Sequence, residues 1–141
     1  MERIAIVGVG QTKYERMKKG DSFADMVFEA TSKALQDARM TIKEIDNVVT
    51  VSNDFWDGRT ISSMTITEAT GSHKSPTTNV EGDGTYGALM GLMRLLSGLH
   101  EITLVVAQSK ISEGVPQVIT NAMFDPIYER MLGLDAINSA A

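Results

Sequence analysis

The feature that most constrains this chain is a strand, a tight glycine turn and a strongly apolar helix that follow one another without a break. A polar strand-type run at 76–81 leads into Gly82-Asp83-Gly84, and within the helical pattern at 84–97 most positions from 88 to 96 carry apolar side chains. A helix that is apolar nearly all round is normally buried between layers, and the start of a helix presents free backbone amides. We therefore expect this turn to face a substrate.

The composition is that of one globular domain. The chain has 141 residues, of which 43% are hydrophobic, enough to bury a core. We predict a single domain over 1–141, with a regular pattern over 1–108 and a loop-and-helix extension over 109–141. The formal net charge of −5 argues against a nucleic-acid surface. No apolar run approaches the roughly 20 residues of a membrane span, and residues 1–10 lack a signal-peptide pattern, so the expected location is cytoplasmic.

The chain contains no cysteine. This excludes disulfides, thiolate metal sites and a cysteine nucleophile together. The two histidines, His73 and His100, stand apart in the sequence without a partner at metal-ligand spacing. The sequence therefore predicts no metal site, and we expect both histidines at the surface or in loops.

Alternating strand and helix patterns predict an α/β domain. Residues 3–9 form an apolar, β-branched run, typical of a strand buried in the middle of a sheet. Ser22 and Asp25 form a capping-box pattern at the start of an amphipathic helix. The order of strand, helix and strand favours parallel pairing. We predict a mixed, mainly parallel central sheet between the helices at 22–39 and 84–97, with further strands at 47–51, 76–81 (an edge) and 101–107.

The remaining segments have weaker patterns. Residues 60–70 have a moderately helical pattern that stops at Gly71. Beyond residue 110 the regular spacing fades, and we expect a loop at 112–122 and a helix at 126–134.

The segment 52–59 combines the only tryptophan of the chain with two carboxylates and an arginine. Two interpretations remain open. In the first, the aromatic side chains close the edge of the domain while Arg59 pairs with Asp54 or Asp57. In the second, Asp54, Trp56 and Arg59 bind a substrate, because loops at the end of a strand often carry functional side chains.

The residues around the glycine turn resemble the thiolase superfamily. In that family a strand leads into a valine, three further residues, a nucleophilic cysteine, a small residue, a serine and a glycine at the start of a long buried helix. Val80 and Gly87 match, whereas Gly84 stands at the cysteine position and Tyr86 at the serine position. The resemblance covers the whole chain but only the first portion of the family's length. The rest of the family's first half and its entire second, mirrored half have no counterpart in this chain.

The resemblance implies roles for the strand and for the turn. In thiolases the equivalent strand pairs with its copy across a dimer axis, which implies an interface at Thr77, Thr78, Asn79, Val80 and Glu81. The implied substrate-binding residues are Asp54, Trp56, Arg59, Gly82 and Gly84. The basic cluster of Lys13, Arg16, Lys18 and Lys19 has two interpretations. It is either a solvated loop or a binding site for an anionic ligand such as the phosphates of coenzyme A.

The candidate catalytic positions are Asp83, Gly84 and Tyr86. Asp83 is either the N-cap of the helix or a catalytic carboxylate, although its acyl adduct would be a reactive anhydride. Gly84 is not a nucleophile, but it leaves room for an enlarged acyl group and uncovers backbone amides for an oxyanion. Tyr86 is either a hydrogen-bond donor or proton shuttle, or an aromatic residue at the edge of the core.

Two functions from different classes follow. The first is an enzyme subunit similar to the lipid-transfer-protein type of thiolase, including steroid side-chain aldolases, which cleaves or forms a carbon–carbon bond of a β-hydroxyacyl- or β-ketoacyl-CoA. It would use a coenzyme A thioester as substrate and no covalently bound cofactor. The second is a non-catalytic subunit for dimerisation, for shielding a ligand or for holding an OB-fold acyl-CoA-binding partner. A degenerate fragment would not explain the well-formed patterning of residues 1–108.

Both functions imply an oligomer. Apolar surface should be exposed where the mirrored half would dock, so we expect a homo- or hetero-oligomer with a chain that supplies the later thiolase portion. Convergence of Asp54, Trp56, Arg59 and Tyr86 on one pocket beside the helix at 84–97 would favour the enzyme. Dispersal of these side chains would favour the non-catalytic subunit.

Overall fold

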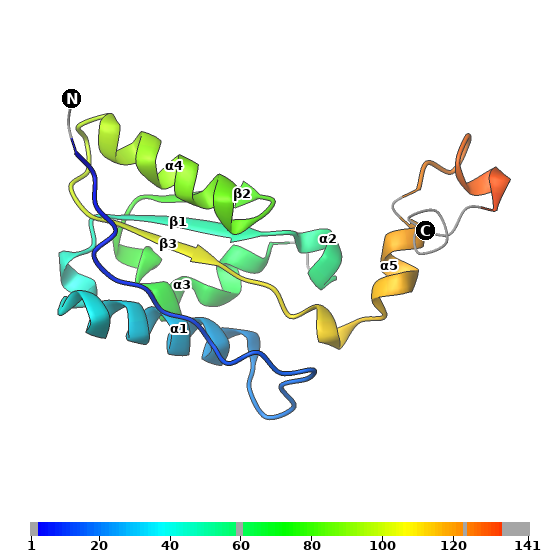
Figure 1. The fold of residues 1–141 in the computed structure, drawn as a ribbon, viewed down its shortest axis with the longest axis horizontal. Helices are drawn as coiled ribbons and strands as arrows, with labels where there is room; N and C mark the ends of the chain where they lie inside the picture. The colour runs from blue at the N-terminus through cyan, green and yellow to red at the C-terminus, as the bar shows by residue number, and fades with distance from the viewer. Residues whose placement is uncertain (1–2, 59–60, 123, 134–141) are drawn as a thin grey trace.

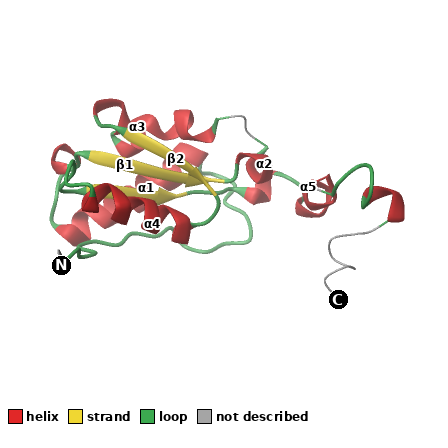
Figure 2. Ribbon diagram, turned by 90° about the horizontal axis from the view of Figure 1, so that it is seen from above, coloured by secondary structure: helices red, strands yellow, loops and turns green. Residues whose placement is uncertain are grey.

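The computed structural model describes residues 3–58, 61–122 and 124–133 (Figure 1). Its centre is a three-stranded sheet in the order β2-β1-β3, built from β1 (Asn47–Ser52), β2 (Thr77–Glu81) and β3 (Thr103–Ala107). Both neighbouring pairs are parallel, with Val49 opposite Thr78 on one side and Val105 on the other. The three arrows accordingly point the same way in Figure 2. The described sheet is therefore wholly parallel rather than mixed.

Helices cover both faces of the sheet. Helix α1 (Phe23–Ala38) lies on one face, next to α3 (Thr67–Thr70), and α4 (Gly84–Leu96) lies on the other (Figure 1). Helix α2 (Asp54–Asp57) follows β1, and α5 (Pro116–Ala122) follows β3. Short 3-10 helices complete the described elements at Ile42–Glu44, Ser62–Ile66, Ser72–Lys74, Ile111–Glu113 and Arg130–Leu132. None of the helices in the described ranges has the length and apolar character needed to cross a membrane.

The core lies between α1 and the sheet. Every residue of β1 is buried, and the cluster around it contains Phe23, Val27, Ile45, Val48, Ile66, Leu104 and Val106. The predicted capping box starts α1, because Ser22 Oγ accepts from the Asp25 amide at 3.2 Å and Asp25 Oδ2 accepts from the Ser22 amide at 2.8 Å. The predicted start of this helix and the strand that follows it are thus confirmed.

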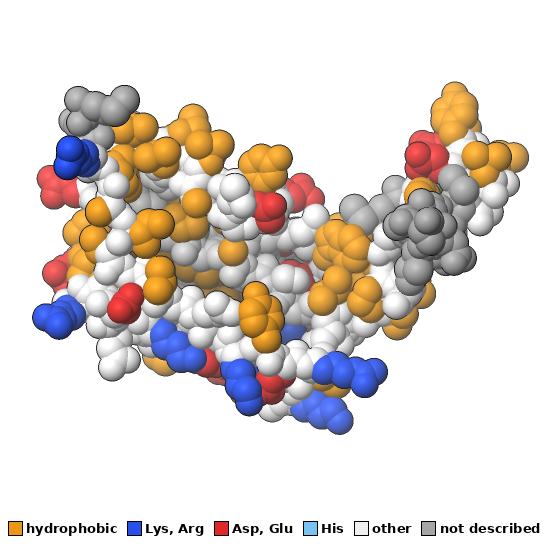
Figure 3. Space-filling model, viewed as in Figure 1, with side chains coloured by type: hydrophobic (Ala, Val, Ile, Leu, Met, Phe, Trp, Pro, Cys, Tyr) orange, Lys and Arg blue, Asp and Glu red, His pale blue; other side chains and the backbone are white. Residues whose placement is uncertain are grey.

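Helix α4 approaches the sheet through two glycines. A Cβ at Gly87 would clash with the side chain of Val51, and a Cβ at Gly91 would lie 2.7 Å from Val105 Cγ2. The outer face of α4 is not covered, contrary to the prediction of a helix buried between layers. Leu89, Met93 and Leu96 are each more than half exposed, and hydrophobic side chains stand out along this edge in Figure 3. The apolar outer face requires a further layer, and no described residue supplies one.

The N-terminal run at 3–9 does not form the predicted central strand. It is extended but has no strand assignment, and it passes along the open side of β3 beside α1 (Figure 1). Ile6 and Val9 are 86% and 69% exposed. The run is apolar and extended, as predicted, but it is not buried, because no described residues cover both of its faces.

Two predictions for the C-terminal region were wrong. Residues 116–122, expected in a loop, form α5, and the helix expected at 126–134 is reduced to a turn and the 3-10 helix Arg130–Leu132. Helix α5 contacts α2 but stands apart from the sheet (Figure 1). Its apolar positions carry little amphipathic pattern because it spans only seven residues.

The close approach of α4 makes a testable difference between two of its glycines. Gly87→Ala should lower the free energy of unfolding by about 1–2 kcal/mol, because overpacking costs more than the helix propensity gained. Gly84→Ala is the matched control, since its Cβ would meet only Ala107 Cβ, at 3.5 Å. Urea unfolding of both variants measures the difference. Equal midpoints would show that α4 is not seated on the sheet through Gly87.

Candidate functional site

A cleft of about 490 Å³ opens at the carboxyl ends of β1 and β3, beside the first turn of α4. In sheets of parallel strands this end is where ligands commonly bind. The fold brings four of the predicted site residues to this cleft, namely Trp56, Gly82, Asp83 and Gly84. The remaining lining residues are Val51, Asn53, Ala107, Gln108, Ser109 and Ile111.

The floor of the cleft is the start of α4. Asp83 Oδ1 accepts hydrogen bonds from the amides of Thr85 at 2.8 Å and Tyr86 at 3.3 Å, so this carboxylate caps the helix. Gly82 has a φ of 136°, which side-chain-bearing residues rarely adopt. Gly84 leaves its backbone open toward the cleft, and its amide is one of the helix's first, which have no acceptor within the helix. This arrangement can receive an oxyanion or a carbonyl oxygen.

Tyr86 points away from the cleft. Its side chain is 60% exposed, and its ring lies 3.0 Å from where a Cβ on Gly82 would stand. Tyr86 is not among the residues that line the cleft. Its proposed role as hydrogen-bond donor or proton shuttle therefore stays a prediction that needs a ligand or partner above the helix.

Asp54 supports the wall of the cleft from behind. It accepts from Ser52 Oγ at 3.0 Å, from the Ser62 amide at 3.3 Å and from Ser62 Oγ. Burial raises the pKa of Asp54, but the hydrogen bonds from Ser62 and Ser52 outweigh it and hold the pKa of this carboxyl below its usual value of 3.8. Asp54 thus remains ionised and ties α2 to the 3-10 helix at Ser62–Ile66.

Asp57 ties the same loop to the end of β3. Its Oδ1 accepts from Ser109 Oγ at 2.9 Å and from the Lys110 amide at 2.8 Å. Arg59, which was expected to pair with Asp54 or Asp57, lies outside the described residues. The structure therefore brings Trp56 together with the glycine turn, keeps Asp54 behind the wall, and leaves Tyr86 outside.

Gln108 is a cleft residue that the sequence did not single out. It is 9% exposed, its Nε2 donates to Ser62 Oγ at 3.3 Å, and its Oε1 is buried without a hydrogen-bond partner among the described residues. The available signal was its position directly after the buried strand β3, at the sheet end where the other site residues gather. Its oxygen is an acceptor that a bound ligand can use.

The predicted interface strand β2 forms the edge of the sheet, as expected. It pairs with β1 on one side, and no described strand pairs with it on the other. Thr77, Asn79 and Glu81 are exposed, while Thr78 and Val80 are half-buried. The dimer contact itself stays a prediction.

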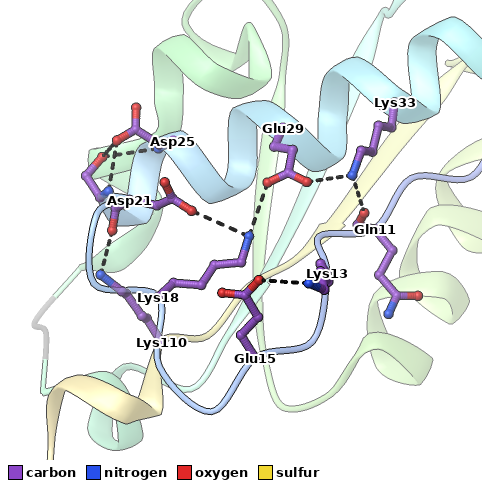
Figure 4. A network of polar contacts seen from close by, with 10 residues as sticks. Gln11, Lys13, Glu15, Lys18, Asp21, Asp25, Glu29, Lys33 and Lys110 are labelled. Atoms are coloured by element: carbon purple, nitrogen blue, oxygen red, sulfur yellow. Dashed lines mark hydrogen bonds and ion pairs between the residues drawn. The ribbon is translucent and has the colours of Figure 1, made fainter.

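The basic cluster is held mainly by acidic neighbours. Lys18 pairs with Glu29 at 3.2 Å and Asp21 at 3.5 Å, and Lys13 pairs with Glu15 at 3.5 Å (Figure 4). The contact between Lys18 and Glu29 anchors the loop on α1, which favours the structural interpretation for Lys18. Within the described ranges, no group of His, Asp and Glu side chains is arranged to hold a metal ion.

No protein-family model matches the chain. Two solved structures are similar to it. One is 3-oxoacyl-[acyl-carrier-protein] synthase III from Aquifex aeolicus VF5, with a TM-score of 0.59 and 16% identity over 69% of this chain and 32% of that chain. The other is the Ltp2-ChsH2(DUF35) aldolase, with a TM-score of 0.63 and 21% identity over 92% of this chain and 31% of that chain.

The fold is thiolase-like. The chain spans about a third of the length of either compared chain. The thiolase-like fold is therefore partial in the described structure. The similarity in fold supports the resemblance inferred from Val80 and Gly87. Any reaction must be argued from the residues of the cleft.

A cysteine placed at the head of α4 tests the electrostatic character of the site. Gly84→Cys should have a thiol pKa below the usual value of about 8.5, because the helix start stabilises the thiolate. Ser97→Cys, at the other end of the same helix, is the control and should have a higher pKa. Since the chain lacks cysteine, the pH dependence of alkylation by iodoacetamide reports each thiol alone. A pKa at Gly84→Cys equal to or above that at Ser97→Cys would contradict this description.

Removing the charge of Asp54 should loosen the cleft wall in a pH-dependent manner. Because the pKa of Asp54 is lowered in the folded chain, its contribution is complete above pH 3.8 and declines as the pH falls through the folded pKa. Asp54→Asn should therefore cost about 1 kcal/mol at pH 7 and less near pH 3. Denaturant unfolding at both pH values measures this. A pH-independent loss would show that the charge of Asp54 is not what the serines stabilise.

Proposed function

We propose that this chain is a subunit of a thiolase-like complex that processes acyl-CoA by cleaving or forming a carbon–carbon bond. The cleft at the start of α4 would hold the acyl thioester, and another polypeptide would supply part of the catalytic machinery. The observation that carries the proposal is the open cleft at Gly84, with the backbone amide of this residue at the cleft and room for a substrate group.

The residues of the cleft favour a route without a covalent intermediate. The chain has no cysteine, and Asp83, the one carboxylate lining the cleft in the described structure, is occupied as a helix cap. In a retro-aldol cleavage, a base removes the proton of the β-hydroxyl group, a carbonyl forms at Cβ, and the Cα–Cβ electron pair passes to Cα. The resulting thioester enolate is then protonated at Cα, so the step needs no nucleophile and no oxidant.

This chain would contribute binding and charge stabilisation to that reaction. The backbone amide of Gly84, at the head of α4, would face the oxygen of the enolate, on which negative charge develops. Trp56 and Val51 would supply apolar walls to the acyl chain, and the unpaired Oε1 of Gln108 would accept a hydrogen bond from a substrate hydroxyl or amide. The base would come from the partner polypeptide.

A hetero-oligomer is supported by one of the similar structures and by an exposed apolar face. The chain spans about a third of each compared chain, and the name of the aldolase joins two components, Ltp2 and ChsH2(DUF35). The exposed apolar face of α4 supports a covering partner as well.

A second function is favoured by the dispersal of the predicted residues, because Trp56 lines the cleft whereas Asp54 and Tyr86 do not. Asp83 is occupied as a cap, so the described cleft offers no free acid or base. The chain would then be a non-catalytic, thiolase-like subunit that serves dimerisation or shields a ligand.

The test is cleavage of a β-hydroxyacyl-CoA by the assembly purified from cells that make it. We expect the assembly to release a shorter acyl-CoA and a carbonyl product. Gly84→Leu should lower kcat/KM by about 100-fold, because the added side chain displaces the substrate. Gly20→Leu is the control, since a Cβ at Gly20 meets no atom within 4 Å and the residue does not line the cleft.

Two results would contradict the proposal. An assembly carrying Gly84→Leu that cleaves as fast as the unsubstituted one would exclude the cleft as the acyl site. A native assembly that binds but does not cleave the thioester would leave the non-catalytic subunit as the function.

A further inference from the structure

A second hollow runs along the open side of β3. It is a groove of about 570 Å³ between the N-terminal segment 4–10 and β3, with α1 on one flank and α4 on the other. Figure 3 shows hydrophobic side chains around the hollow on this face. None of the described residues that line it is charged, and they include Ile4, Val7, Ala34, Leu92, Leu95 and Val105.

The far wall of the groove is held in place by α1. A Cβ at Gly8 would lie 2.7 Å from Ala38 Cβ, and a Cβ at Gly10 would clash with the backbone of Ala30. The Val9 amide also donates to Asp37 Oδ2 at 2.9 Å. The segment is thus seated against α1 by two glycines, yet it forms no backbone ladder with β3.

The near wall is an unpaired strand edge. The Gln108 amide donates to the Val51 carbonyl at 2.9 Å, and the Ile102 carbonyl accepts from the Asp46 amide at 3.2 Å. Because backbone groups alternate in direction along a strand, the even-numbered residues of β3 face β1. The amides and carbonyls of Thr103, Val105 and Ala107 therefore face the groove, where no described residue pairs with them.

The floor of the groove carries a further unmet hydrogen-bonding group. Thr31, on α1, lines the groove and is 4% exposed, and its Oγ1 has no hydrogen-bond partner among the described residues. A buried hydroxyl without a partner is costly. The groove therefore combines apolar walls with backbone and side-chain groups that lack partners.

We propose that this groove is the seat of one apolar, uncharged β-strand from the partner polypeptide, which pairs with β3 and joins residues 4–9 to the sheet. The absence of charge in the described walls favours an uncharged occupant, and the free backbone edge of β3 favours an extended one. About two thirds of each compared chain has no counterpart here. This inference rests on the hetero-oligomer of the proposed function.

Amide hydrogen exchange in the native assembly and in the isolated chain tests the proposal residue by residue. In the assembly, exchange of Thr103, Val105 and Ala107 should slow by at least about tenfold. The Leu104 and Val106 amides already face β1 and are the internal control, so their exchange should change much less. An assembly in which the three groove-facing amides exchange as in the isolated chain would overturn the strand seat while leaving the proposed function intact.

The source of the strand is decided in the same experiment. Slowed exchange in a preparation that contains this chain alone would assign the groove to a second copy and overturn the partner strand. Recovery of this chain from its cells as a monomer, with the three amides still fast, would overturn the strand seat and the proposed hetero-oligomer together.

A second test places a charged side chain in the groove and compares it with the same substitution outside the groove. Ile6→Lys should weaken assembly by at least about tenfold, because the strand would bury the ammonium group, and it should leave the isolated chain folded, since Ile6 is 86% exposed. Met17→Lys is the control, as Met17 is half exposed and does not line the groove. Equal assembly affinities of the two variants, measured by sedimentation of the mixed subunits, would contradict the proposal.

Discussion

The contact between the glycine face of α4 and the sheet is the constraint on which the rest of this structure depends. Gly87 and Gly91 leave no side chain between the helix and the strands β1 and β3, so Val51 and Val105 fill that space. This close approach fixes where the helix begins. Asp83 then caps the first turn, and the amides at the head of α4 face the cleft at the carboxyl ends of the strands. The candidate site is thus a product of backbone packing more than of reactive side chains.

Local signals in the sequence were sufficient for the parts of the fold that depend on neighbouring residues. The capping pair Ser22 and Asp25, the cap at Asp83 and the edge position of β2 were all predicted, because each follows from a few adjacent side chains. The thiolase-like fold was inferred from the turn around Gly84, and the similar solved structures support it. Trp56 was singled out by its loop and Gly82 and Gly84 by the glycine turn, and the structure places all three at one cleft.

The predictions that were wrong concern burial, which a local pattern does not determine. Residues 3–9 and the outer face of α4 have the composition of buried elements, yet both are exposed in the described structure. Gln108 was missed because a single amide after a strand has no pattern, and its burial comes from Ser62, far away in the sequence. The two mistaken faces share one physical reason, since each is an apolar surface that no described residue covers.

These uncovered surfaces give the account its central claim, that the chain completes its fold and its site with another polypeptide. Native mass spectrometry of the protein drawn from its own cell extract tests this most directly. The account predicts a complex of this chain with a second, longer polypeptide, with an acyl-CoA retained when the cleft is filled. A ligand-free oligomer that contains copies of this chain alone would contradict it.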